Sequence, residues 1–449
     1  MASAGDALRA LEDAAIPAII DPDILATIGR DWTDTVVGEP AALVRPPSTD
    51  AVRAVLAAAS RHAVPVTIQG GRTSLVAGAV PEFGAVALAT DALRGVEELD
   101  LASMSVVVGA GTTLAELDAA LEPYHLELGV DLASRDSATL GGMAATNAGG
   151  LRVLRYGAMA RNVLGLELVT GAGRILGSVA RPEKASGLDH VRLAIGTEGL
   201  LGVITRLRLR VVARPQTRVA LVIGAARLEE LVATLATLRP RLAPWLEAAE
   251  FFRGSDLEHS GLTPPRSEQW LALLQLASPI VDDEQPLEAL PSDLDATVGV
   301  DAPTRERLWA TREALPLATA RLGIPLKLDV AVPIARLGEL ADSLVTLEHD
   351  PQIRAVLLFG HLAEGNCHVN IALEPGAHTE ELTQQVFGIV TGLHGVIASE
   401  HGVGRTKRAW IRELLDEVEI TALAATKRAF DPAWIVNRGV LLPEDAELP

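Results

Sequence analysis

Residues 137–150 read Ser-Ala-Thr-Leu-Gly-Gly-Met-Ala-Ala-Thr-Asn-Ala-Gly-Gly. Almost every side chain in this stretch is small, and four of the fourteen residues are glycine. Because these side chains are small, a large flat ligand can lie directly against the backbone. Thr146 and Asn147 can then form hydrogen bonds with the polar edge of that ligand. Close packing of neighbouring elements is the alternative explanation, because it also requires small residues.

A second loop of small residues stands earlier in the chain, directly after a predicted strand over residues 64–68. It reads Gln69-Gly70-Gly71-Arg72-Thr73-Ser74. Glycines at this place let backbone N–H groups approach a diphosphate, and the hydroxyl groups add donors. A tight strand-to-helix turn needs similar residues, so this loop by itself does not decide between the two. Neither loop has the Gly-x-Gly-x-x-Gly spacing of a Rossmann dinucleotide site.

The surrounding sequence alternates helix and strand signals. Ser48 or Thr49 can cap a helix that ends near His62, and Thr113 with Glu116 has the spacing of a capping box. Further strands are predicted at residues 85–90, 105–110, 164–170 and 202–212, helices mixed with amphipathic strands over residues 216–355, and a helix over residues 410–429. Pro215 closes the first region, so we expect a domain boundary near residue 213.

The composition narrows the class of protein. The chain has 449 residues, a net charge of −19 and 49% hydrophobic residues, which fits two or three packed domains. The acidic balance argues against a nucleic-acid partner and against docking on an anionic membrane, because both need clustered Lys and Arg. No apolar run is long enough to span a bilayer. The single cysteine, Cys367, excludes an internal disulfide and favours a cytoplasmic location.

Histidines gather in one part of the chain, with five of the ten between residues 361 and 401. Residues 359–370 predict a strand, a turn and a strand. If Glu364-Gly365 is a two-residue turn, His361 pairs with His368 across the hairpin. Directly opposed side chains point to one face about 5 Å apart, so the two imidazoles can clamp one metal ion.

The third ligand can come from a glycine-flanked loop that contains Glu400 and His401. Two histidines and one carboxylate with open positions form the pattern of catalytic zinc or a similar divalent ion. Asn370 falls on the same face of the hairpin by the period of two. Histidines that are solvated or bonded within the fold are the alternative, and the spacing alone leaves both explanations open.

The order of these motifs resembles the FAD domain of the vanillyl-alcohol-oxidase superfamily, in the branch of D-lactate, D-2-hydroxyglutarate and glycolate dehydrogenases. The resemblance runs from about residue 30 to residue 442. The motifs that carry it are Arg45-Pro46, residues 69–75, 138–142 and 145–150, Arg155-Tyr156-Gly157 and residues 196–205. The implied fold is α+β: a two-part FAD-binding domain of the vanillyl-alcohol-oxidase (PCMH) type, then an α+β substrate/cap domain with an antiparallel sheet. The implied domains are residues 1–213, residues 214–405 with the metal site, and a C-terminal helical segment over residues 406–449 that returns to the flavin.

The resemblance also implies which residues hold the cofactor. Covalent attachment in this superfamily usually uses histidine or cysteine, and neither occurs in residues 64–78 or 131–150, so we expect noncovalent FAD. The implied cofactor-binding residues are Pro46, Gln69, Gly70, Gly71, Arg72, Thr73, Ser74, Leu75, Ser137, Thr139, Gly141, Gly142, Thr146, Asn147, Gly149, Gly150, Tyr156, Glu198, Gly202, Ile204 and Asn437. Asn437 stands in Asn437-Arg438-Gly439, where relatives often have Asn-Pro-Gly.

The resemblance assigns the histidine cluster as well. In relatives the two motif histidines and the glutamate bind zinc, which here are His361, His368 and Glu400. The sequence departs from the family motif at Ala363 and Glu364, where relatives usually carry Gly and Asp, and this puts the turn geometry in doubt. His401 is the candidate base, because imidazole titrates near neutrality, although a structural role is the alternative.

Three residues are implied in substrate binding, namely Arg312, Lys327 and Asn370. The first two resemble cationic positions that hold a carboxylate, and each could instead be an ordinary surface charge. In dicarboxylate-specific relatives a threonine commonly lies four residues after that arginine. Pro316 occupies this position here and lacks both a side-chain donor and a backbone N–H, which predicts weaker selection for 2-hydroxyglutarate.

The implied reaction is FAD-dependent oxidation of a D-2-hydroxy acid to the 2-oxo acid, with hydride transfer to flavin N5 and assistance from a divalent metal, most simply zinc. The implied partners are the small acid and an electron acceptor such as an electron-transfer flavoprotein, a quinone or a dye-like acceptor, and a homodimer is left open. A transferase of the ether-lipid synthase type would share the FAD domain, but no separate long lipid-binding segment is seen. A metallohydrolase would not need residues 137–150, and a non-catalytic flavoprotein subunit of a glycolate-oxidase-like complex would be expected to lose the histidines.

Overall fold

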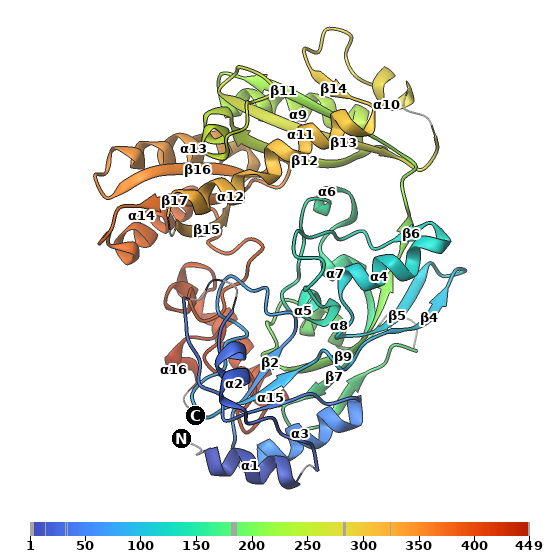
Figure 1. The fold of residues 1–449 in the computed structure, drawn as a ribbon, viewed down its shortest axis with the longest axis vertical. Helices are drawn as coiled ribbons and strands as arrows, with labels where there is room; N and C mark the ends of the chain where they lie inside the picture. The colour runs from blue at the N-terminus through green and yellow to red at the C-terminus, as the bar shows by residue number, and fades with distance from the viewer. Residues whose placement is uncertain are drawn as a thin grey trace. The chain divides into compact units, whose positions relative to one another are not determined.

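The computed structural model describes residues 4–13, 15–31, 33, 35–180, 186–281, 284–323 and 325–447. The chain forms two compact units (Figure 1). The first comprises Met1–Gly150, Gly157–Ala213 and Glu400–Pro449, and the second comprises Leu151–Tyr156 and Arg214–Ser399. Three consecutive segments were expected instead. The structure differs because residues 151–156 pack with the second unit and residues 400–405 pack with the first.

The first unit begins with a parallel sheet of the order β1-β3-β2, formed by Ala42–Val44, Val86–Ala89 and Val66–Gln69. The predicted helix after Ser48 is confirmed as α3 (Thr49–Arg61), and the Ser48 hydroxyl accepts the N–H of Ala51 at 3.2 Å. This helix buries its apolar face next to the sheet. Two further helices, α1 (Ala4–Asp13) and α2 (Pro22–Ile28), precede it.

The second part of the first unit is a five-stranded antiparallel sheet of the order β4-β5-β9-β7-β8. Its strands are Val96–Asp100, Ser105–Gly109, Gly202–Arg210, Val163–Thr170 and Ile175–Gly177. The capping box is confirmed: Thr113 accepts the N–H of Glu116, and Glu116 accepts the N–H of Thr113, at the start of α4 (Leu114–Leu121). Shorter elements are η1 (Glu122–Tyr124), the pair β6 (Leu126–Glu127) and β10 (Val212–Ala213), α7 (Met159–Asn162) and α8 (His190–Ala194).

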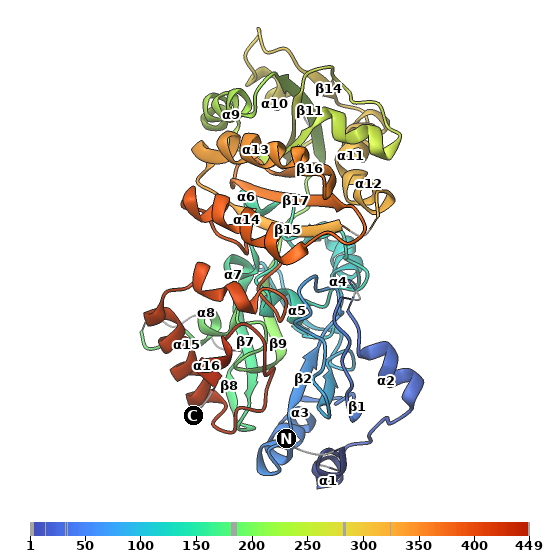
Figure 2. The same ribbon diagram turned by 90° about the vertical axis from the view of Figure 1, so that its left-hand side faces the viewer.

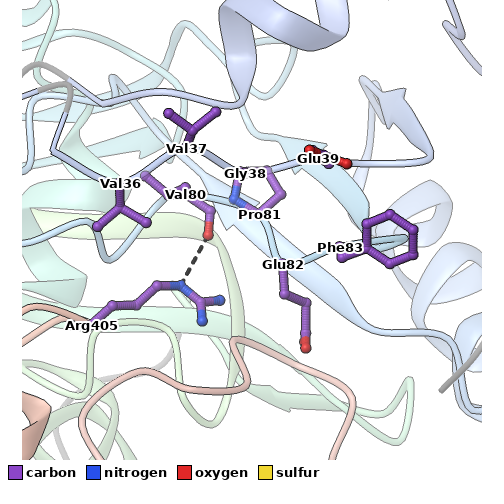
Figure 3. Close-up of a pocket in the computed structure, with 9 residues that line it drawn as sticks. All are labelled: Val36, Val37, Gly38, Glu39, Val80, Pro81, Glu82, Phe83 and Arg405. Carbon is purple, nitrogen blue, oxygen red and sulfur yellow. Dashed lines mark hydrogen bonds between the residues drawn. The ribbon is translucent and has the colours of Figure 1, made fainter.

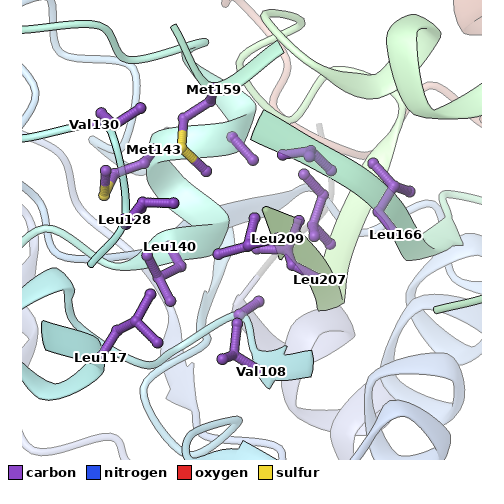
Figure 4. Close-up of a cluster of buried hydrophobic side chains, with 14 of the residues drawn as sticks. Val108, Leu117, Leu128, Val130, Leu140, Met143, Met159, Leu166, Leu207 and Leu209 are labelled. Atoms are coloured by element: carbon purple, nitrogen blue, oxygen red, sulfur yellow. The ribbon is translucent and has the colours of Figure 1, made fainter. Parts of the chain in front are cut away.

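The small-residue stretch contributes to the core of this sheet. Residues 140–145 form the short helix α5 (Leu140–Ala145), in which Leu140 and Met143 are buried. They pack with Val108 and Leu207 of the sheet in one apolar cluster (Figure 4). Packing of Leu140 and Met143 against the five-stranded sheet therefore fixes the position of the small-residue stretch.

The C-terminal segment returns to the first unit. A helix was predicted over residues 410–429, but α15 (Glu417–Phe430) begins later, because Asp416 caps it and Arg408–Glu413 forms the 3-10 helix η5. The last helix is α16 (Glu444–Glu447). Among the residues that the structure describes, every helix is too short or too polar to cross a membrane.

The second unit is built on the expected antiparallel sheet, with seven strands in the order β14-β11-β13-β12-β16-β17-β15. They are Thr297–Gly299, Thr217–Ala225, Trp270–Ser278, Leu246–Arg253, Ile353–His361, Asn366–Leu373 and Pro325–Ala331. Figure 2 shows α9 (Leu228–Leu242), α13 (Leu337–Val345) and α14 (Thr379–Gly392) on one side of the sheet, and α11 (Ala302–Glu313) and α12 (Leu315–Arg321) on the other. Helices on both sides bury both faces, so the central strands are buried almost throughout rather than on one face only, as amphipathic strands would be. Short helices complete the unit: α6 (Val153–Tyr156), η2 (Gly254–Ser260), α10 (Glu284–Glu288), η3 (Ile334–Arg336) and η4 (Thr346–His349).

The predicted pairing of His361 with His368 is wrong. In the hairpin of β16 and β17, Phe359 lies opposite His368, and residues 362–365 form a four-residue turn in place of the predicted two-residue turn. The N–H of Val332 donates to Gly365 O at 3.0 Å, so contacts of the turn with a third segment set its length. The register is shifted by two residues, which is one full side-chain period, so His361 and His368 still share one face.

Candidate cofactor and metal sites

One face of the seven-stranded sheet carries the predicted metal and substrate residues of the second unit. Cross-strand register places Glu250 opposite His361, and Asp329 opposite His368. Two residues further along each of these two strands, Lys327 lies opposite Asn370. Since paired residues point to the same side of a sheet, these six side chains form adjoining rows. The His361 and His368 rings are 5.3 Å apart, centroid to centroid, at an angle of 83°.

Each of the two imidazoles faces a buried carboxylate through its Nδ1 atom. His361 Nδ1 lies 2.6 Å from Glu250 Oε1, and His368 Nδ1 lies 3.3 Å from Asp329 Oδ1. Both acidic side chains are within 1% of complete burial. A carboxylate on Nδ1 is the arrangement that orients a metal-binding histidine and leaves Nε2 as the ligand atom, so this donor set fits a divalent metal ion.

Glu250 is held from its other side by Arg312. The Arg312 Nε donates to Glu250 Oε2 at 2.9 Å, and the guanidinium lies 4.5 Å from the centre of the Phe359 ring. Burial acts to raise the pKa of Glu250, but the neighbouring His361 and Arg312 outweigh it and hold this pKa below its ordinary value. Arg312, predicted to hold the substrate carboxylate, is thus a buried residue with one donor already used by Glu250.

Asp329 connects three segments. Its Oδ1 accepts from Asn366 Nδ2 at 2.8 Å in addition to facing His368, and its Oδ2 accepts from the backbone N–H of Ser399 at 3.1 Å. Ser399 is the last residue of the second unit, directly before the predicted ligand Glu400. The sequence analysis singled out neither Asp329 nor Glu250. The available signal was an acid inside an otherwise apolar strand, in Leu-Asp-Val and in Ala-Ala-Glu-Phe-Phe.

In the first unit the two small-residue loops lie side by side. A Cβ atom on Gly71 would lie 1.8 Å from Ser137 O, and a Cβ atom on Gly70 would lie 2.5 Å from Thr139 Oγ1. Both glycines are therefore required by close packing of one loop on the other, the alternative that the sequence left open. Gly141 and Gly150 are packed in the same way, against Ala110 and Asp131 O.

Close packing does not account for the backbone donors of the first loop. Among the residues that the structure describes, none accepts a hydrogen bond from the backbone N–H groups of residues 71–75. These five residues, which include Arg72, Thr73, Ser74 and Leu75, are only half-buried. Consecutive N–H groups without acceptors form a concavity for an anion, so this loop fits the diphosphate of a dinucleotide.

Several side chains predicted to bind the cofactor instead hold the loops. Gln69 Nε2 donates to Ile28 O and Ala79 O, each at 2.8 Å. Asn147 Oδ1 accepts the N–H of Ala160 at 2.8 Å, and Thr146 Oγ1 donates to Gly142 O at 3.1 Å. The side-chain atoms that the sequence assigned to the polar edge of the ligand are thus partly committed to the protein itself.

Glu198 links three segments of the first unit. Its carboxylate accepts the N–H groups of Val403 and Gly404 at 2.7 and 2.8 Å, and its carbonyl oxygen accepts from Asn437 Nδ2 at 2.7 Å. Burial raises the pKa of the Glu198 carboxyl, against the effect of the two N–H groups. Glu198, predicted to bind the cofactor, therefore fixes the backbone two residues after His401.

Four of the predicted cofactor residues have a left-handed backbone conformation. Arg72, Asn147, Glu198 and Asn437 all have φ between 43° and 53° without being glycine. Such conformations cost free energy and persist mainly where a binding site requires them. Asn437 Oδ1 also accepts the N–H of Ile68 at 2.8 Å, which brings it to the strand before the first loop.

The remaining predicted residues occupy separate places. Pro46 is buried before α3, Gly149 lies between Asn147 and Gly150, and Gly202 and Ile204 are on β9. Tyr156 belongs to the second unit, where its hydroxyl lies 3.3 Å from the buried Glu247. Glu400 and His401 belong to the first unit, and Glu400 Oε1 accepts the N–H of Gly150 at 3.4 Å.

A separate cavity of about 280 Å³ lies in the first unit between residues 36–39 and 80–83 (Figure 3). Arg405 closes one side of it, and its Nε donates to Val80 O at 3.1 Å. None of the predicted cofactor, metal or substrate residues lines this cavity. It therefore has no part in the assignments above.

Known protein families account for most of the chain. Residues 40–177 match the FAD binding domain family, and residues 214–441 match the family of FAD linked oxidases, C-terminal domain. The protein is thus an FAD-linked oxidoreductase with a PCMH-type FAD-binding domain. A solved alkyldihydroxyacetonephosphate synthase has the same fold, with a TM-score of 0.71 over 95% of this chain and 82% of its own, at 19% identity.

Two relatives define the family more narrowly. The mitochondrial D-2-hydroxyglutarate dehydrogenase of Danio rerio is 32% identical over 444 residues, which cover 95% of this chain and 83% of the relative. The D-2-hydroxyglutarate dehydrogenase of Stutzerimonas stutzeri (strain A1501) is 32% identical over 448 residues, covering 94% and 95%. The chain belongs to the FAD-linked D-2-hydroxy-acid dehydrogenase family.

Proposed function

We propose that this enzyme oxidises a D-2-hydroxy acid to the 2-oxo acid with noncovalent FAD, assisted by a divalent metal ion, most simply zinc. The observation that carries the proposal is the row of side chains on one sheet face. His361 and His368, each held by a buried carboxylate, adjoin Lys327 and Asn370 in register. Names of relatives support the substrate class, since two are D-2-hydroxyglutarate dehydrogenases.

The spacing on this face suits a 2-hydroxy acid. On neighbouring strands, a residue and its diagonal neighbour, which is offset by two positions, are about 7 Å apart. Long side chains can bridge this distance. Lys327 is half-buried, and burial lowers the pKa of its ammonium. A cation with few waters around it is well suited to hold a carboxylate. In this proposal Lys327 and Asn370 hold the acid by its carboxylate, with Arg312 supplying its remaining N–H groups.

The proposed metal ligands are His361, His368 and Glu400. A metal ion bound there would lower the pKa of the substrate hydroxyl. FAD would supply the two-electron acceptor, with hydride arriving at flavin N5. His401, next to Glu400 in the chain, would take the hydroxyl proton. Glu198 keeps the backbone of residues 403–404 in place behind this base.

A flavin-bleaching experiment tests the proposal. The purified holoenzyme is mixed anaerobically with D-lactate, D-2-hydroxybutyrate, D-2-hydroxyglutarate and their L-enantiomers, and flavin absorbance is followed. We expect the D-acids to bleach the flavin and a dye-like acceptor, standing in for an electron-transfer flavoprotein or quinone, to restore it. A flavoprotein that none of these acids reduces would contradict the proposed reaction. Metal analysis of the same sample tests the metal separately.

A further inference from the structure

The geometry points to Glu250 as a positioning residue that fixes the tautomer of His361, one of the two proposed metal-binding imidazoles. In this inference the Glu250 carboxylate keeps the proton of His361 on Nδ1, so that Nε2 is the bare nitrogen offered to the metal ion. The presence of a metal ion rests on the proposed function above. The tautomer of His361 does not, because it is a property of the protein without metal.

The first step is the chemistry of the contacts. An ionised carboxylate accepts hydrogen bonds and donates none. The nitrogen that faces it must therefore carry a proton, and in a neutral imidazole the other nitrogen is then bare. His361 Nδ1 and Glu250 Oε1 are 2.6 Å apart, and His368 Nδ1 and Asp329 Oδ1 are 3.3 Å apart. The first contact is a hydrogen bond and requires His361 Nδ1 to be protonated, whereas the second lacks hydrogen-bond geometry and does not fix the tautomer of His368.

The second step is that the Glu250 carboxylate cannot turn away. Glu250 Oε2 is held by Arg312 Nε at 2.9 Å. This acid therefore has one side fixed by a donor and presents its other oxygen to His361. Asp329 differs, because its Oδ1 accepts from Asn366 Nδ2 at 2.8 Å and its Oδ2 accepts the N–H of Ser399 at 3.1 Å, so both of its oxygens already have donors.

Amide substitutions convert this arrangement into a test. In Glu250→Gln the amide oxygen must stay with the Arg312 donor, so the amide NH₂ turns to His361. A donor in place of an acceptor forces the proton from Nδ1 to Nε2 and blocks the nitrogen that binds metal. The side-chain volume barely changes.

Asp256→Asn is the matched control. Asp256 is also a buried acid of this unit, and it also accepts one side-chain donor, Arg253 Nε at 2.6 Å, and one backbone N–H, Leu358 at 2.9 Å. Among the described residues, its polar neighbours are Arg253, Leu358 and Glu348, and none of them is a histidine. Any effect of simply losing a buried charge should therefore appear in this variant too.

The experiment uses the full-length FAD-bound enzyme with ¹⁵N-labelled histidine. Ring-nitrogen spectra of the metal-stripped protein report the tautomers, and competition with a coloured chelator reports the affinity for zinc. We expect His361 of the parent protein to be protonated on Nδ1. Glu250→Gln should move His361 to the Nε2-protonated form, with a loss of zinc affinity of about 10- to 100-fold. Asp256→Asn should change neither the His361 tautomer nor the zinc affinity, and FAD content should be unchanged in both variants.

Each contrary outcome has its own meaning. A parent protein whose His361 is protonated on Nε2 would overturn the inference without any variant, even if the variants fail to fold. A variant that loses zinc while its histidine keeps the Nδ1 proton would make that acid a direct metal ligand, which also overturns the inference. A parent protein that binds no zinc would contradict the proposed metal function, while the spectra would still decide the positioning roles.

Discussion

Lys427 and Asp431 form an ion pair at 2.6 Å in which both side chains are completely buried in the first unit. The Lys427 ammonium also donates to Leu200 O and Val436 O, at 2.7 and 2.6 Å. The pair thus binds α15 to the segment after Glu198 and to the residue before Asn437. Together with the hydrogen bonds of Asn437, this cation joins the C-terminal segment to the part of the first unit proposed to hold FAD.

Removing the cation should be costly. In Lys427→Ala the carboxylate of Asp431 stays buried without its partner, and breaking such a pair typically costs about 3–5 kcal/mol. We expect this loss in the free energy of unfolding by urea, together with weaker retention of FAD. Arg428→Ala removes an exposed cation from the same helix and should cost less than about 1 kcal/mol. Equal stability of the two variants would contradict the role of the buried pair.

FAD should be bound noncovalently through the first small-residue loop. Acid precipitation should release the flavin into the supernatant, and yellow colour kept by the pellet would contradict this. Gly71→Val should abolish FAD binding, because its Cβ would lie 1.8 Å from Ser137 O and push the loops apart. Gly388→Ala is the control, since a Cβ there meets nothing within 4 Å and flavin content should stay at the parental level.

Single substitutions should distinguish the proposed metal ligands from the proposed general base. His361→Ala and His368→Ala should each remove the metal and most activity while FAD stays bound, because all the predicted cofactor residues except Tyr156 lie in the first unit. His401→Ala should retain the metal and slow flavin reduction by about 100-fold or more, the usual cost of a lost general base. His378→Ala, at an exposed histidine, should do neither. Full metal occupancy in both of the first two variants would exclude them as ligands.

The choice of acid depends on the position four residues after Arg312. Pro316 is exposed and offers no donor for a second carboxylate, and a hydrogen bond to a charged group is worth about 1.5–3 kcal/mol. We therefore expect D-lactate and D-2-hydroxybutyrate to reduce the flavin at rates comparable with D-2-hydroxyglutarate. Stopped-flow reduction by the three acids measures this. A rate far higher with D-2-hydroxyglutarate would show that Pro316 does not set the selection.

The stability of the second unit should depend on Asp256. Burial raises the pKa of its carboxyl to about 6, from 3.8. The folded protein therefore holds this proton over a pH range in which the unfolded chain has lost it, so this group's contribution to stability falls as the pH rises from about 4 to 6. The size is on the order of 3 kcal/mol, at about 1.4 kcal/mol for each pH unit. The free energy of unfolding by urea is measured for the parent and Asp256→Asn proteins at pH 4 and pH 7. The decrease from pH 4 to pH 7 should be larger in the parent than in Asp256→Asn by about this amount. An equal change with pH in the two proteins would exclude the role of Asp256.

The sequence by itself determined the features that depend on neighbouring residues. The capping box of Thr113 and Glu116 formed as its spacing required, because both partners lie within one helical turn. The shared face of His361 and His368 also followed from the sequence, since it depends only on the alternation of side chains and survives a register shift of two residues. The two small-residue loops were found for the same reason, because glycine content is a local property.

Only the tertiary structure decided the partners that come from distant segments. The length of the hairpin turn was set by Val332, and the carboxylates beside the imidazoles came from Glu250 and Asp329, more than thirty residues away in the chain. Likewise, Asn147 and Glu198 looked like ligands of a cofactor until the fold brought Ala160 and Val403 to them. Local sequence shows which donors and acceptors a segment has, but a buried polar group must be satisfied by whatever group packing places beside it, and that is fixed only when the whole chain has folded.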